Sequence, residues 1–420
     1  MSATTSIRPP HEAKPRGSGP IAVGVQDYLA RLRGGDVGAL PAVLGLAVLL
    51  AIFTVMRPHA FANLFNAANL LNQSARVMFI AMGLVFVLLL GEIDLSAGFT
   101  AGTAAAVLAV LSGQHGMAWP IAVFGSLIAG AAIGALIGML VARLGIPSFV
   151  VTLAFFLGLQ GVMLLVIGEG GTIRISDSTI LSIMNDNLSP LLSWLLFAVV
   201  AGGYALAQFL GLRRSRAHGV TATPLPVVIV KVVALTLLLA GGTFALVQER
   251  AVNPALASIR GIPVIVPFTI VFLVGLTFLL TRTSFGRHVY AVGGNAEAAR
   301  RAGINVKGIK VACFVISSSM AAIAGILIAS RDNSVSPQSG GSTTLLLAVA
   351  AAVIGGTSLF GGKGRIVDAV LGGLVIAVID NGLPLITQKA GIQFIVTAGV
   401  LLLAASVDAL ARRRAATSGR

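Results

Sequence analysis

WPIAVFGSLIAGAAIGALIGMLV, residues 119–141, is a run of 23 positions without a charged side chain. An α-helix needs about 20 apolar residues to cross the hydrocarbon core of a bilayer, because each residue advances it by about 1.5 Å. Further apolar runs lie along the chain at 39–56, 74–90, 95–111, 147–168, 190–211, 226–247, 263–281, 309–330, 343–361, 366–386 and 391–411. We therefore predict an all-α fold, a polytopic transmembrane helical bundle. The short runs at 74–90 and 95–111 fit either two spans or one re-entrant unit, which leaves about 10–12 spans.

The composition excludes a soluble domain. Of the 420 residues, 56% are hydrophobic and only 10% are charged, whereas soluble domains carry about 25% charged residues. The net charge of +15 would suggest nucleic acid in a soluble protein, but the basic residues lie between apolar runs, so we expect membrane lipid and no nucleic acid as partner. The single cysteine, Cys313, lies in an apolar run and is interpreted as a small buried hydrophobe.

The basic residues also predict the orientation. With the N-terminus inside and twelve crossings, the inner segments hold 21 of the 29 Lys and Arg residues, the outer segments hold 7, and Lys231 lies within a span. This bias is the one that the positive-inside rule describes. We therefore predict cytoplasmic tails at 1–38 and 412–420, and a transmembrane domain at 39–411.

The longest inner segment, 282–310, contains the sequence GGNAEAARRAG at 293–303. Asn295 is a good N-cap, Glu297 lies in the first turn of a short helix, and Gly303 suits the position after it. Its small side chains would let the groove of another protein approach the backbone. The pattern fits a docking helix as well as it fits a helix that only connects two spans. The candidate docking residues are Gly293, Gly294, Asn295, Glu297, Ala298, Ala299 and Arg300.

A second polar segment, GEIDLSAG at 91–98, lies between two apolar runs. Carboxylates next to membrane depth are costly, so Glu92 and Asp94 suggest a functional site. Helix capping explains them as well, because Asp94 or Ser96 can cap the following helix and Glu92 is favoured by its dipole. Both interpretations stay open, and they are compatible.

Other polar residues lie inside the predicted spans. Thr152 and Gln160 lie on the helix that begins at Pro147, and Asp380 and Asn381 lie on the span at 366–386. Such residues either line a polar path or bond to a neighbouring helix. The candidate path residues are Glu92, Asp94, Ser96, Thr152, Gln160, Asp380 and Asn381. The four-residue spacing of Gly130, Gly134 and Gly138 predicts a close helix–helix contact.

Several chemistries are absent from the sequence. Residues 361–364, GGKG, look like the end of a phosphate loop, but Thr357 replaces the required glycine and Gly364 replaces the Ser/Thr that would hold Mg²⁺. No metal-binding pattern and no nucleophile elbow occur in the sequence. We therefore expect no cofactor, no metal and no enzymatic activity, and any ATP used in transport must bind to another chain.

Four stretches together resemble one family. Residues 91–98, 146–153, 281–304 and 353–358 are similar to the permease subunits of ribose-, arabinose-, galactose- and xylose-type ABC importers, which reside in the bacterial inner membrane. The run GRHVYAVGGNAEAAR at 286–300 is highly specific. Glu92, and the additional pair of spans around Arg213–His218, look most like the xylose-type branch.

This resemblance implies a sugar importer, with a pentose such as xylose as the expected cargo. Two copies would form the pore, an ATP-binding subunit would dock at Gly293–Gly303, and a periplasmic sugar-binding protein would dock at the outer loops 168–189 and 248–262. An ion-coupled secondary transporter of a small polar solute is the alternative, because Asp94 and Asp380 could titrate or bind an ion. A membrane enzyme is the third candidate, but it would need convergent catalytic groups that the sequence does not offer.

Overall fold

The computed structural model describes residues 40–218, 224–251 and 258–400, together with Leu402 and Ser406. In this part of the chain, nine helices are long and apolar enough to cross a membrane. They are α4 (Leu64–Leu89), α5 (Ala97–Ala109, continued by a π-helical turn at Val110–Gln114), α6 (Trp119–Arg143), α7 (Ser148–Ile167), α9 (Pro190–Ala217), α10 (Leu225–Val247), α11 (Ile265–Arg282), α14 (Val306–Asp332) and α16 (Ile366–Ile386). Three shorter apolar helices are α2 (Leu40–Met56), α15 (Ser342–Gly355) and Ala390–Val400.

Each of the twelve predicted runs overlaps one of these helices, the last run over residues 391–400, and this confirms the polytopic helical fold. The start of the second run is a correction: α4 begins at Leu64, ten residues earlier than the sequence suggested, because the Asn63 side chain caps it by accepting a hydrogen bond from Asn66 N at 2.7 Å. α4 is thus long enough to cross the bilayer by itself. The alternative in which the runs 74–90 and 95–111 form one re-entrant unit does not apply. The predicted tails at 1–38 and 412–420 lie outside the described residues.

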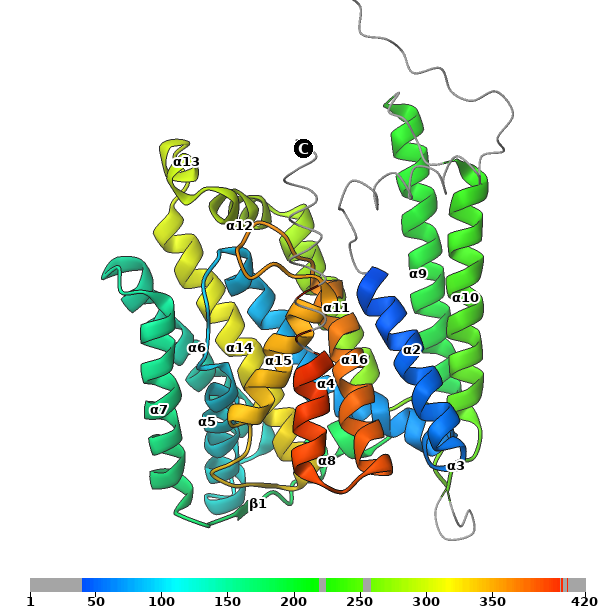
Figure 1. The fold of residues 1–420 in the computed structure, drawn as a ribbon, viewed down its shortest axis with the longest axis horizontal. Helices are drawn as coiled ribbons and strands as arrows, with labels where there is room; N and C mark the ends of the chain where they lie inside the picture. Colours follow the sequence, from blue (N-terminus) through cyan, green and yellow to red (C-terminus); the bar gives the residue numbers. More distant parts are fainter. Residues whose placement is uncertain (1–39, 219–223, 252–257, 401, 403–405, 407–420) are drawn as a thin grey trace, which may run out of the picture.

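The connecting elements gather at the two ends of the bundle. At one end, called the α13 end, lie α12 (Ser284–Gly294) and α13 (Ala296–Arg301), at the top of Figure 1. At the other, called the α8 end, lie α3 (Pro58–Phe61), α8 (Ser178–Asn185) and the antiparallel strands β1 (Ile173–Arg174) and β2 (Ser334–Val335). Of the segments predicted to be inner, the one that contains α12 and α13 lies at the α13 end.

The centre of the bundle consists of two similar three-helix units of opposite direction. α4, α5 and α6 form one unit, and α14, α15 and α16 form the other. α4 packs against α14, while α6 packs on α14 and α16 packs on α4 in equivalent positions. Each unit thus places its third helix on the first helix of the other unit.

Glycines allow these helices to approach closely, as the sequence predicted for α6. A Cβ atom at Gly130 would lie 2.8 Å from the carbonyl oxygen of Ser318, and one at Gly138 would lie 2.8 Å from the Cα of Val311, both on α14. Gly134 has a Phe314 oxygen 2.5 Å from its Cβ position. Because lipid is as apolar as the helix interiors, such van der Waals contacts hold membrane helices together. Cys313, on the same part of α14, is fully buried, as interpreted.

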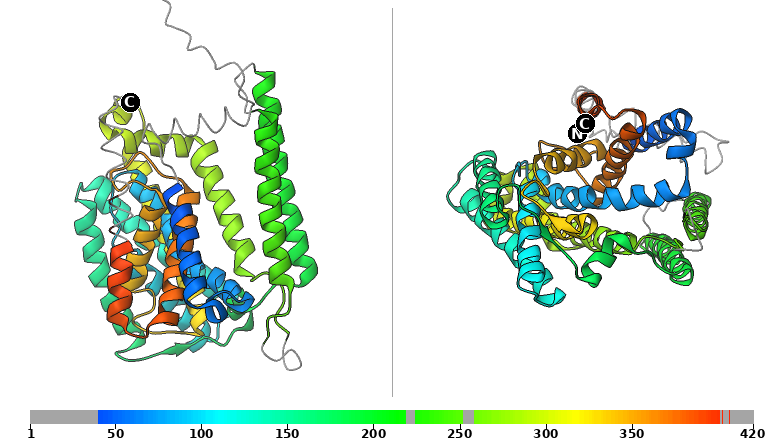
Figure 2. Two further views of the ribbon diagram at one scale, coloured as in Figure 1. Left: turned by 45° about the vertical axis from the view of Figure 1, so that its right-hand side comes forward. Right: turned by 90° about the horizontal axis from the view of Figure 1, so that it is seen from below.

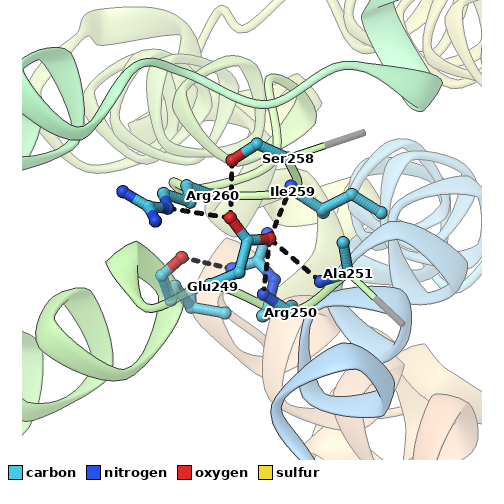
Figure 3. A network of polar contacts seen from close by, with 7 residues as sticks. Glu249, Arg250, Ala251, Ser258, Ile259 and Arg260 are labelled. Atoms are coloured by element: carbon cyan, nitrogen blue, oxygen red, sulfur yellow. Dashed lines mark hydrogen bonds and ion pairs between the residues drawn. The ribbon is translucent and has the colours of Figure 1, made fainter. Parts of the chain in front are cut away.

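α9 and α10 form a hairpin that stands beside the bundle in both views of Figure 2. A polar network at the α8 end organises the chain that leaves α10 (Figure 3). Glu249 accepts hydrogen bonds from Ser258 Oγ at 2.6 Å, from the backbone N–H groups of Ala251 and Ile259 at 3.0 and 2.9 Å, and from Arg260 Nε at 2.9 Å. These bonds, led by the one from Ser258, lower the pKa of Glu249 to about 2.

Candidate functional site

The candidate docking helix forms as predicted. α13 spans only six residues, Ala296–Arg301, and Asn295 Oδ1 caps it by accepting a hydrogen bond from Ala298 N at 2.9 Å. Gly303, at φ +84°, ends it in the left-handed conformation. The Ile304 N–H then donates to the Ala299 carbonyl at 3.1 Å, so the end of the helix is closed by the local chain.

The exposed surface of α13 combines alanine with charged side chains. Ala298 is exposed, whereas Ala299 is only 5% exposed and anchors the helix. Glu297 pairs with Arg300 and with Arg301, and the hydrogen bonds from these two side chains, first Arg300 and then Arg301, lower its pKa. The Glu297 carboxylate is therefore engaged within α13, and a partner would meet the exposed Ala298 together with the side chains of Arg300 and Arg301, which are 70% and 80% exposed.

The glycine before α13 that matters structurally is Gly293. A Cβ atom there would overlap the carbonyl oxygen of Leu89, at the end of α4, and would lie 3.0 Å from Gly362 N. Gly294, by contrast, has ordinary helical backbone and open space around its Cβ position, so nothing in the fold requires glycine there. The need for glycine comes from the approach of α4, which sequence spacing does not reveal.

The loop between α15 and α16 completes this contact. Gly362 N donates to the Leu89 carbonyl at 2.9 Å, and the Tyr290 hydroxyl of α12 donates to the Gly364 carbonyl at 2.7 Å. Gly361, Gly362 and Gly364 all have positive φ, which glycine adopts at little cost. Residues 361–364 thus serve as a structural connector that joins α12 to α4.

The chain continues from this contact through the segment 91–98. Glu92 forms an ion pair with Lys310 of α14. Both backbone groups of Ile93 are held by the first turn of α7: its N–H donates to Ser148 Oγ at 3.1 Å, and its carbonyl accepts from Thr152 Oγ1 at 3.2 Å. The structure therefore joins two motifs that the sequence analysis treated separately.

Asp94 lies at the centre of a buried hydrogen-bond cluster. Its Oδ1 accepts from Ser96 N at 3.0 Å and from Ser96 Oγ at 2.6 Å, and its Oδ2 accepts from Ser317 Oγ of α14 at 3.0 Å. Ser96 occupies the N-cap position of α5 but makes no capping bond with its side chain. Of the two residues that the sequence offered for capping, Asp94 rather than Ser96 accepts a backbone N–H at the start of α5. Glu92 pairs with Lys310.

The start of α5 meets the start of α15 inside the bundle. A Cβ atom at Gly340, just before α15, would lie 2.5 Å from the Gly98 carbonyl and 2.7 Å from Gly102 N, both in α5. A Cβ atom at Gly98 would in turn lie 2.9 Å from the Leu345 Cβ of α15. The N-terminal ends of α5 and α15 therefore approach each other closely enough to require glycine at the contact.

The remaining candidate residues lie elsewhere. Asp380 and Asn381 face α4, where Asp380 pairs with Arg76 at 3.0 Å and Asn381 exchanges two hydrogen bonds of 2.9 Å with Asn66. Gln160 is exposed on the outer face of α7, apart from Thr152, which is buried. No group of three potential metal-binding side chains occurs in the part of the chain that the structure describes.

Residues 66–405 match the family described as branched-chain amino acid transport system / permease component. The chain belongs to this permease family. It is 34% identical to the xylose transport system permease protein XylH of Escherichia coli K12 over 394 residues, 94% of this chain and 97% of the relative. It is 31% identical to the ribose import permease protein RbsC of the same strain over 366 residues, 87% of this chain and 92% of the relative. No solved structure matches the chain.

As a permease, the chain is a transport component and not an enzyme. Sequence reasoning missed several residues that its structure assigns to these sites. Lys310 and Ser317 pair with the segment 91–98 from α14, and Arg76, counted with the outer segments, lies inside α4. Only one group of these residues could have been found from the sequence. The spacing of Asn66, Asn69, Gln73 and Arg76 places their side chains on one face of a helix.

Proposed function

We propose that this permease is the membrane-spanning subunit of an ATP-driven sugar importer in the bacterial inner membrane, and that its cargo is a pentose of the xylose type. The observation that carries the proposal is the 34% identity to the xylose permease over 94% of this chain. The ribose permease and the D-allose permease AlsC, 30% identical over 365 residues, support a monosaccharide as cargo.

In this proposal, α13 is the element that an ATP-hydrolysing subunit binds. Its exposed Ala298 and its closed ends give a short preformed helix for insertion into a groove, and Arg300 and Arg301 add exposed charge beside it. α12 would pass the resulting movement to α4 and to the loop 361–364 through Gly293 and Tyr290.

Two copies of the permease would enclose the path, and the sugar-binding protein would meet the α8 end. The α13 end would be cytoplasmic together with both termini, because the basic segments 282–310 and Arg213–Arg216 lie at that end. Glu92, Asp94, Ser96, Thr152, Gln160, Asp380 and Asn381 stay candidates for the path. The ion-coupled alternative is weakened, because Asp94 is held by two serines and Asp380 is paired with Arg76.

Affinity purification of the tagged permease from native membranes tests this function. We expect an ATPase chain and a sugar-binding protein to co-purify, and we expect vesicles containing the three components to take up labelled xylose only with ATP inside. Uptake that continues without ATP and stops when the ion gradient is collapsed would establish the ion-coupled alternative instead.

A further inference from the structure

A stripe of polar side chains follows one face of α4, the second helix to cross the bilayer. We call Asn66, Asn69, Asn72, Gln73 and Arg76 the α4 stripe. At 100° per residue these positions fall within about one third of the helix circumference. Arg76 lies twelve residues after Leu64, so the stripe reaches about 18 Å along the helix from its first residue.

Residues from α14 and α16 line both sides of this stripe. Asn381 bonds to Asn66, and its Nδ2 donates to Gln73 Oε1 at 3.2 Å, while Asp380 pairs with Arg76. On the other side, Arg331 of α14 donates to Asn69 Oδ1 at 2.9 Å. Three helices therefore contribute amide, carboxylate and guanidinium groups to one surface.

The charges of this surface balance. Arg76, Arg331, Asp332 and Asp380 lie close enough to interact electrostatically, and they sum to zero. A balanced set offers no excess charge to hold an ion. It offers instead a dense array of donors and acceptors, which is what a neutral, hydroxyl-rich solute needs.

The stripe is open on one side. The side chains of Asp380 and Arg76 are 40% and 28% exposed, and Asn69, Asn72 and Gln73 are partly exposed. Charged and amide groups in a membrane helix face the bundle interior or a water-filled cavity, because contact with lipid tails is costly. Within the described part of the chain, two buried atoms of the stripe, Arg76 Nε and Asn72 Oδ1, lack hydrogen-bond partners.

We propose that the α4 stripe, with Asp380 and Asn381, is a sugar-contacting wall of the translocation path, where water and then sugar hydroxyls meet the open side. This inference rests on the proposed function, and it adds Asn69, Asn72, Gln73, Arg76 and Arg331 to the path. The amides and the paired charged groups of the stripe would hydrogen-bond to a neutral polyhydroxylated solute. Because the charges of this surface sum to zero, an ionic solute gains no net electrostatic attraction.

Cysteine accessibility tests the water-filled side. Cys313 is the only cysteine in the sequence and is buried, so the chain is close to a cysteine-free background. Gln73→Cys and Asn69→Cys are treated with a charged, membrane-impermeant thiol reagent applied from the α8 side. Leu237→Cys, on an exposed and apolar part of α10, is the matched control, because its side chain is 67% exposed and would face lipid. We expect both stripe variants to react, the control to remain unmodified, and xylose with the binding protein to slow the reaction.

The double variant Arg76→Gln/Asp380→Asn tests the contact with sugar, because it removes both charges and leaves no unpaired ion. We expect the KM for uptake to rise about tenfold, with unchanged membrane level and unchanged ATPase co-purification. Unreactive stripe cysteines, reaction rates that sugar does not change, or an unchanged KM would each overturn the inference. Uptake and co-purification of the unsubstituted permease are measured in parallel, so that failure of the proposed function is recognised separately.

Discussion

Gly293 of α12 and Leu89 of α4 are in direct backbone contact, and a Cβ atom at position 293 would overlap the Leu89 carbonyl oxygen. The same oxygen accepts the Gly362 N–H at 2.9 Å. One carbonyl group therefore joins the helix before α13, the end of α4 and the α15–α16 loop. From Leu89 the chain continues to α5 through residues 90–96. The loop that contains Gly362 follows directly after α15.

Gly293→Ala should weaken the coupling of ATP hydrolysis to uptake. The added methyl group must push α12 away from α4, and overpacking of this kind costs about 1–3 kcal/mol. We expect ATPase co-purification to persist while ATP-driven uptake falls strongly. Gly294→Ala is the matched control, since nothing lies within 4 Å of its Cβ position. Equal uptake by both variants would contradict the coupling role of the contact.

Ala298→Trp should abolish docking without affecting the bundle. Ala298 is exposed on α13, so an indole ring there projects outward and fills the space that a partner groove needs. We expect normal membrane level, lost ATPase co-purification and lost uptake, whereas Ala298→Ser should behave like the original chain. If the ATPase stays bound to the Trp variant, α13 is only a connecting helix.

Asp94→Asn should destabilise the segment that precedes α5. An amide nitrogen replaces one of the two carboxylate oxygens, so one serine hydroxyl loses its acceptor in a buried site, at a cost of about 1–3 kcal/mol. A double-mutant cycle with Ser317→Ala, read as thermal stability in detergent and as uptake, isolates the Asp94–Ser317 bond of 3.0 Å. Strictly additive effects would show that this bond does not contribute.

The Glu249 network should resist acid. The folded-state pKa of Glu249, about 2, lies below its ordinary value of 4.5, so the ionised carboxylate favours the folded loop above about pH 4.5, and this contribution is lost only as the pH falls toward 2. Amide exchange at Ala251 and Ile259, corrected for intrinsic rates, should therefore show the same protection at about pH 7 and at about pH 4.5. Glu249→Gln should lower that protection at both pH values. A loss of protection in the unsubstituted chain over this range would show that the pKa is not lowered.

Reporter fusions test the orientation. A reporter after Arg420 or within 212–225 should be cytoplasmic, and one within 170–188 should be periplasmic, because 21 of the 29 basic residues fall on the predicted inner side. A periplasmic reporter after Arg420 would rule out an even number of spans.

Features that depend on neighbouring residues were determined by the sequence itself. The length of each apolar run predicted a membrane helix, because a bilayer accepts only segments whose backbone bonds are satisfied internally. Asn295 predicted the start of α13, because a cap acts on the N–H groups of the next turn. The spacing of Gly130, Gly134 and Gly138 predicted a packing face for the same kind of reason, since residues four apart share one side of a helix.

Only the tertiary structure decided which distant groups meet. Lys310 is 218 residues from Glu92, and Asn381 is 315 residues from Asn66. Each of these side chains has local alternatives, such as capping a helix or facing water, and the sequence does not choose among them. Gly293 and Gly294 are indistinguishable in the sequence, and only the approach of Leu89 makes one of them necessary. The choice is made when α4, α12 and α14 pack, because a contact between helices depends on the relative placement of whole segments and not on the pattern within any one of them.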